Sequence, residues 1–101
     1  MSVNVELKKD TSELVIKISG RFDFSKHQEL REASEQAGSN IKQVIVDLRA
    51  TEYVDSSALG MLLVLRDKIG GEKQKVKIVN AKPEVKKILE IASFDKLFTL
   101  V

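Results

Sequence analysis

The chain has 101 residues, of which 43% are hydrophobic and 32% are charged. This length is typical of one domain, and this composition excludes low-complexity disorder. The 17 basic and 15 acidic residues give a net charge of +2, too small to indicate a nucleic-acid partner. The chain has no cysteine, which excludes disulfides, thiolate metal sites and thiol chemistry.

No targeting or membrane segment is recognisable. Residues 1–9 alternate polar and apolar side chains, whereas a signal peptide needs a continuous apolar run. The longest apolar run, Met61 to Leu65, is far shorter than the roughly 20 residues of a membrane helix. We therefore expect a cytoplasmic protein that does not insert directly into a membrane.

The first forty residues predict two strands and a helix. Apolar residues alternate from Val3 to Leu7 and again from Leu14 to Ile18, with a polar turn between them. Gly20 interrupts the second strand. The sequence from Ser25 to Gln28 fits a capping box, which predicts that a helix begins near Lys26. The sequence Gly38-Ser39-Asn40 is expected to end this helix, because glycine allows a left-handed residue after the last turn.

A strand and a second helix are expected next. The apolar run Val44 to Leu48 is typical of a central strand covered on both faces. A loop from Arg49 to Val54 should follow, and Asp55-Ser56-Ser57 supplies three good capping residues for a helix over Ala58 to Ile69. The pair Gly70-Gly71 should end that helix.

The remaining segments complete an α/β pattern. Val76 to Val79 reads as a strand, Pro83 suits the first position of a third helix, and Phe98 to Val101 could form a last short strand. The order predicts a small mixed sheet of four or five strands with three or four helices packed on it. Ligand sites in such sheets lie beyond the carboxyl ends of the strands, which selects the loops Gly20 to Ser25 and Arg49 to Ser57.

A search for catalytic chemistry supports no active site. His27 is the single histidine, so no second imidazole is available for a metal site or a catalytic triad. Asp23, Asp47 and Asp55 are far apart in the sequence, and no phosphate-binding glycine motif occurs. We expect no enzyme activity, no metal and no other cofactor.

Three aromatic residues lie in the two selected loops. Phe22 and Phe24 flank Asp23 in the first loop, and Tyr53 lies in the second. Packing in the core is one interpretation of these rings. The other is an exposed apolar patch that contacts a protein partner.

The sequence Asp55-Ser56-Ser57 is the most informative motif. Helix capping alone explains such a triplet in most sequences. The same position also accommodates a phosphate, because unpaired N–H groups and the helix dipole favour negative charge there. A helix cap of this kind can therefore also be a phosphorylation switch. Gly60, inside the expected helix, would let that helix pass close to a neighbouring element, although glycine costs about 1 kcal/mol relative to alanine.

The sequence resembles the STAS-domain family, the bacterial anti-sigma factor antagonists. The resemblance runs nearly end to end, through Ile18 to Asp23, Val44 to Leu48 and above all Val54-Asp55-Ser56-Ser57-Ala58-Leu59-Gly60. It implies a single STAS domain over residues 1–101. In the family, a partner kinase that is also the anti-sigma factor phosphorylates the second serine of the motif, here Ser57. Ser56 is the fallback position.

The resemblance implies a protein-binding switch without catalytic groups of its own. It assigns kinase binding to Asp23 and Asp55, and the partner surface that we expect comprises Asp23, Asp55, Ser56, Ser57, Phe22, Phe24 and Met61. The implied partners are a serine kinase of the histidine-kinase-like ATPase type and a serine phosphatase. The alternatives are a STAS regulator of biofilm or stress signalling, a constitutive subunit of a membrane lipid or anion transport complex, or a small-ligand binder or enzyme using the two loops.

Overall fold

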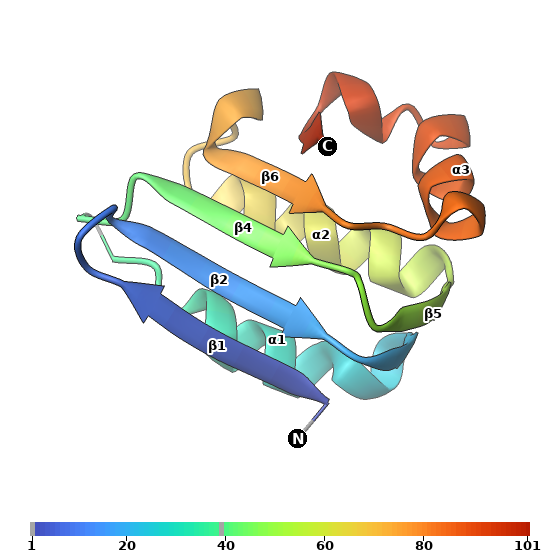
Figure 1. Ribbon diagram of the computed structural model, residues 1–101, viewed down its shortest axis with the longest axis horizontal. Coiled ribbons are helices and arrows are strands. Elements are labelled where there is room, and N and C mark those ends of the chain that lie inside the picture. Colours follow the sequence, from blue (N-terminus) through green and yellow to red (C-terminus); the bar gives the residue numbers. More distant parts are fainter. Residues whose placement is uncertain (1, 39) are drawn as a thin grey trace.

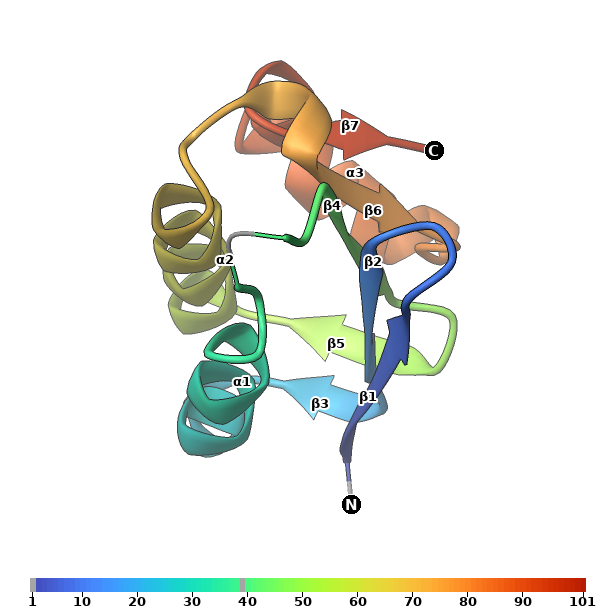
Figure 2. The same cartoon turned by 90° about the vertical axis from the view of Figure 1, so that its left-hand side faces the viewer.

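Two helices lie against one face of a mixed sheet in the computed structural model, which describes residues 2–38 and 40–101 (Figures 1 and 2). The strands are β1 (Val3–Lys8), β2 (Glu13–Ile18), β3 (Gly20–Phe22), β4 (Gln43–Asp47), β5 (Thr51–Val54), β6 (Val76–Val79) and β7 (Thr99–Leu100). The helices are α1 (His27–Ser34), α2 (Ser56–Lys68) and α3 (Pro83–Ile91). Three short 3-10 helices complete the fold: η1 (Phe24–Lys26), η2 (Lys73–Lys75) and η3 (Phe94–Lys96).

The main sheet has the strand order β1-β2-β4-β6-β7, with β4 at its centre. Strand β1 pairs with β2 in the antiparallel direction, whereas β2, β4, β6 and β7 are parallel. These pairings confirm the expected α/β fold with a small mixed sheet and a central strand near Val44 to Leu48. The short final strand was also expected, and it covers Thr99 and Leu100.

The core lies between the main sheet and helices α1 and α2. Alternate residues of the central strands, such as Ile16, Val46 and Ile78, are fully buried on the helix side. Both helices lie on this side (Figure 2), and Ile45, which points to the other face, is only partly buried. The expectation that the central strand is covered on both faces was wrong. Helices α1 and α2 cover only one face of β4, and the side chains on its other face stay partly exposed.

The two loops selected from the sequence contain a second, smaller pair of strands. Strands β3 and β5 are parallel to each other and form a sheet of their own. Thr51 anchors this pair to the main sheet, because its buried hydroxyl donates a hydrogen bond to the carbonyl oxygen of Ile18 at 2.7 Å. Gly20, with a φ of +76°, makes the turn from β2 into β3. The expected loop from Arg49 to Val54 is therefore largely a strand.

The start of α1 differs from the predicted capping box. Asp23 is the capping residue, and its carboxylate accepts a hydrogen bond from the Ser25 backbone N–H. The chain then makes the 3-10 turn η1 before α1 begins at His27. The helix ends at Ser34, before the predicted stop at residues 38–40, of which residue 39 lies outside the described part of the chain.

The other helix predictions agree with the structure. Asp55 is the N-cap of α2, which begins at Ser56, two residues earlier than expected. Gly70 and Gly71 come after its end and both have positive φ angles, as the prediction of a glycine stop required. Pro83 occupies the first turn of α3, which lies beside β5.

Candidate functional site

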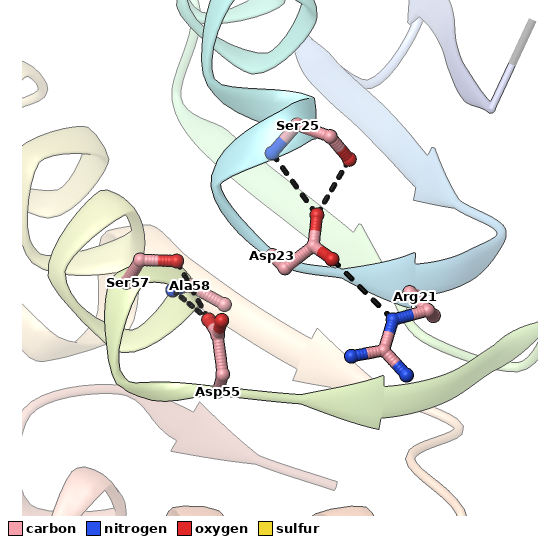
Figure 3. A network of polar contacts seen from close by, with 6 residues as sticks. All are labelled: Arg21, Asp23, Ser25, Asp55, Ser57 and Ala58. Carbon is pink, nitrogen blue, oxygen red and sulfur yellow. Dashed lines mark hydrogen bonds and ion pairs between the residues drawn. The ribbon is translucent and has the colours of Figure 1, made fainter.

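The site begins where the paired strands β3 and β5 end. Phe22 is paired with Val54 in the parallel register, so the next residues, Asp23 and Asp55, leave neighbouring strands side by side. Figure 3 shows both carboxylates at the starts of the turns that come next. The two loops selected from the sequence thus converge on one edge of the molecule, as expected for parallel strands.

Asp55 holds the first turn of α2. Its Oδ1 atom accepts a hydrogen bond from the Ala58 backbone N–H at 3.0 Å and another from the Ser57 hydroxyl at 2.6 Å (Figure 3). The Ser57 hydroxyl, followed by the Ala58 amide, holds the pKa of Asp55 below its usual value. Partial desolvation and the charge of nearby Asp23 act in the opposite direction. Asp55 is therefore a carboxylate at neutral pH, ready to accept both bonds.

Asp23 makes a similar arrangement on the neighbouring turn. Its Oδ1 atom accepts hydrogen bonds from the Ser25 hydroxyl at 2.5 Å and from the Ser25 N–H at 3.0 Å. The Ser25 hydroxyl is the largest cause that lowers the pKa of Asp23. The Oδ2 atom of Asp23 forms an ion pair with Nε of Arg21 at 3.4 Å. The Arg21 guanidinium lies 4.4 Å from the centre of the Tyr53 ring. Charge and aromatic surface thus meet beside the acidic pair.

The two candidate phosphorylation sites differ in their surroundings. Ser57 is partly buried and its hydroxyl is bonded to Asp55, whereas Ser56 is exposed at the first position of α2. A phosphate on Ser57 would lie near the positive end of the helix dipole, which favours it. The same phosphate would also lie beside the carboxylates of Asp55 and Asp23, which repel it. Phosphorylation of Ser57 would therefore change the local charge without disturbing the hydrophobic core, of which Ser57 is not a part.

The structure separates the two phenylalanines of the first loop. Phe24 is 67% exposed and stacks on the His27 ring at a centroid distance of 5.0 Å, so it is available for contact with a partner. Phe22 is completely buried in the core. The assignment of Phe22 to the partner-binding surface was therefore wrong. Side chains alternate between the two faces of a strand, and Phe22, the last residue of β3, lies on the face that is turned to the core.

A groove between α1 and α2 adjoins the site, and sequence reasoning missed it. The groove has a volume of about 560 Å³, and Ser57, Phe24 and Met61 are among the residues that line it. Val64 and Lys68 also line it, although neither was among the expected site residues. The spacing of Ser57, Met61, Val64 and Lys68 along one helix face was the available signal, but the other wall belongs to a helix more than twenty residues earlier.

Other kinds of site are not evident in the described part of the chain. No group of three histidine, aspartate or glutamate side chains within residues 2–38 and 40–101 is arranged to hold a metal ion. The helices seen in these residues are also too short or too polar to cross a membrane.

A small α/β domain with a serine at the capped start of its second helix has the architecture of a STAS domain. The model of the STAS domain family matches residues 3–101, and the chain belongs to this family. It is 47% identical over 100 residues to a STAS-domain containing protein of Pseudomonas aeruginosa (strain UCBPP-PA14), with 99% of each chain covered. The family resemblance read from the sequence is thus confirmed.

Solved structures show the same fold at low sequence identity. An anti-sigma factor antagonist from Mycobacterium paratuberculosis is similar with a TM-score of 0.79 at 22% identity, covering 98% of this chain and 85% of that one. The Bacillus cell fate determinant SpoIIAA in its phosphorylated form has a TM-score of 0.65 at 16% identity, covering 98% of this chain and 90% of that one. The fold of this chain is therefore that of the anti-sigma factor antagonists.

Proposed function

We propose that this chain is a cytoplasmic protein-binding switch of the anti-sigma factor antagonist kind. It binds its partner when Ser57 is unphosphorylated and releases it when Ser57 is phosphorylated. The observation that carries the proposal is the position of the Ser57 hydroxyl, 2.6 Å from Asp55, on a residue that lines an apolar groove. The chain needs no catalytic group for this role, because the partner supplies ATP and the kinase activity.

The physical basis of release is a change of charge at one atom. A phosphate adds about −1.5 to −2 charges at neutral pH. It also removes the proton that Ser57 donates to Asp55, so an attractive contact becomes a repulsive one. If this weakens binding by the 1 to 3 kcal/mol typical of coupled sites, the affinity falls roughly 5- to 150-fold.

The partner that we propose is a serine kinase of the histidine-kinase-like ATPase type that also acts as an anti-sigma factor, with a serine phosphatase that resets the switch. The existence of SpoIIAA in a phosphorylated form supports a phosphorylated state for a domain of this fold. The acidic pair Asp23 and Asp55, together with exposed Phe24, provides a mixed charged and apolar surface for this partner. Ser56 and Met61 complete the surface.

Capture of partners by matched variants tests the proposal. Ser57→Ala and Ser57→Asp proteins are immobilised side by side, exposed to lysate of the native host, and the captured proteins are identified by mass spectrometry. We expect a kinase-like ATPase on the Ala variant and its loss from the Asp variant. Thr11→Ala and Thr11→Asp serve as controls at an exposed hydroxyl in the turn between β1 and β2, outside the proposed partner surface, and both should retain the partner.

Identical captures by the two Ser57 variants would contradict the switch. Transporter subunits among them would instead identify Ser57 as an ordinary helix cap and the chain as a constitutive subunit of a transport complex. Ser57-dependent capture of a signalling protein unrelated to sigma factors would keep the switch and change its pathway.

A further inference from the structure

The groove between α1 and α2 is built from one face of each helix. Lining residues recur at helical spacing, as His27, Arg31 and Ser34 do on α1 and Ser57, Val64 and Lys68 do on α2. The helices run in the same direction, because they come after the parallel strands β3 and β5 and because Lys68 Nζ donates to Ser34 Oγ at 3.3 Å near their last turns. The groove therefore has two distinct ends, with Ser57 at one and Lys68 at the other.

The polar groups of the groove are unbalanced in charge. Arg31 and Lys68 line it together with His27, and no aspartate or glutamate is among the lining residues. Within residues 2–38 and 40–101, neither Arg31 nor Lys68 forms an ion pair. Both residues lie toward the carboxyl ends of their helices. Lys68 is 11 residues after Ser57 on α2, which corresponds to roughly 16 Å along the helix axis. The apolar wall thus ends in uncompensated positive charge.

Gly60 indicates how closely a partner approaches. It is exposed in the middle of α2, and a Cβ atom built on it would meet no atom within 4 Å. The expectation that Gly60 lets α2 pass close to a neighbour within this chain was therefore wrong. Glycine weakens a helix, so an open glycine in a groove wall is best explained by a partner backbone that packs against it.

The exposed walls indicate a macromolecular occupant. Val64 and Phe24, which line the groove, are 60% and 67% exposed. A small ligand sunk between the helices would leave both exposed. A third helix lying across the two walls would cover them, as when an amphipathic helix lies in an apolar groove.

We propose that the α1–α2 groove binds an amphipathic helix of the partner protein, with its apolar face over Gly60 and Val64 and acidic residues beside Arg31 and Lys68. This inference rests on the proposed function, because it names the element that the switch holds and releases. A phosphate on Ser57 acts at the opposite end of the same groove. There it places a charged group beside the apolar face of the helix, and the cost of burying that charge weakens binding.

Fluorescence anisotropy with two designed peptides tests the groove directly. Both peptides are amphipathic helices with the same leucine face. Each has about 18 residues, because shorter isolated helices are only marginally stable in water. One carries glutamate and glutamine on its polar face, and the other carries lysine and glutamine. We expect the acidic peptide to bind the purified, unphosphorylated chain at least about tenfold more tightly than the basic one.

Two variants assign the binding to the groove. Arg31→Glu combined with Lys68→Glu should reverse the preference for the acidic peptide. Lys17→Glu combined with Lys42→Glu makes the same change in net charge at exposed positions outside the groove lining, and should leave the preference intact. Gly60→Leu should abolish binding while circular dichroism shows an unchanged fold, because the added side chain would enter the groove.

Equal binding of the two peptides, or no binding of either at about 1 mM, would overturn the proposal. So would unchanged binding by Gly60→Leu, or displacement of the acidic peptide by oleate or by vesicles of anionic phospholipid, which would identify a lipid site instead. The assay needs neither the kinase nor phosphate on Ser57. Its failure therefore leaves the capture experiment with the Ser57 variants standing, and failure of that experiment leaves the groove standing.

Discussion

Asp23 and Asp55 occupy equivalent places in two neighbouring turns. Each is the first residue after a strand of the β3–β5 pair, and each accepts a hydrogen bond from the hydroxyl of the serine two positions later. The two turns differ in the helix that each of them starts. Ser25 is exposed on a single 3-10 turn, whereas Ser57 is partly buried at the start of a helix of 13 residues and lines the groove. This difference favours Ser57, which the family resemblance also selects, as the position of the proposed switch.

The acidic pair should make the stability of the domain depend on pH in the acid range. The pKa values of Asp23 and Asp55 are lower in the folded chain than the usual 3.8, mainly because of the Ser25 and Ser57 hydroxyls. The folded state therefore binds protons less readily than the unfolded chain. The stabilisation is complete above the usual pKa and is lost as the pH falls through the lower folded values.

Urea unfolding at a series of pH values between about 7 and 2 measures this effect. The Asp23→Asn, Asp55→Asn double variant should lose less stability on acidification than the unmodified chain. An identical loss in both proteins would show that other carboxylates cause the acid sensitivity.

Phe22 and Phe24 should separate folding from binding. Phe22→Ala should lower the free energy of unfolding by about 3–5 kcal/mol, because it leaves a cavity in the core. Phe24→Ala should change the stability by no more than about 0.5 kcal/mol, because that ring is mostly exposed, and should reduce capture of the partner. Urea denaturation and the capture assay measure the two effects. Full capture by Phe24→Ala would remove this ring from the partner surface.

Gly60 and Gly20 form a matched pair of glycines, because a Cβ atom at either position meets no atom within 4 Å. Gly60→Ala should stabilise the domain by about 0.5–1 kcal/mol, since alanine is the better helix former. Gly20→Ala should destabilise it by about 1–2 kcal/mol, because alanine is strained at a φ of +76°. Thermal unfolding of the two variants checks both signs. A loss of stability in Gly60→Ala would mean that α2 needs this glycine for its own packing.

The choice between the two serines can be made by direct phosphorylation. We expect a kinase captured from the native host to phosphorylate the unmodified chain and Ser56→Ala, and not Ser57→Ala. Tandem mass spectrometry of the product locates the phosphate. A phosphate on Ser56 in the unmodified chain would move the switch to the exposed neighbour.

Local patterns were sufficient for most elements. The alternation in β2 comes from side chains that face one core, and the Asp55 cap and the Gly70-Gly71 stop act within single turns of α2. The predicted capping residue before α1 was wrong, although the helix begins within one residue of the expected start, because two capping patterns overlap there. Asp23 and Ser25 can each cap a helix, and the pairing of β3 with β5 places Asp23 at the turn.

The sequence by itself determined the order of the main-sheet strands and of the three α-helices, the family, and the serine at the start of α2, but not the strands β3 and β5. Only the tertiary structure decided that Phe22 points inward while Phe24 points outward, because β3 ends at Phe22 and the chain turns at Asp23. It also decided that Asp23 lies beside Asp55 and that α1 and α2 form a groove. Local patterns report the preferences of neighbouring residues. The features that only the structure decided depend on contacts between segments about thirty residues apart, which form only when the strands pair and the helices pack on them.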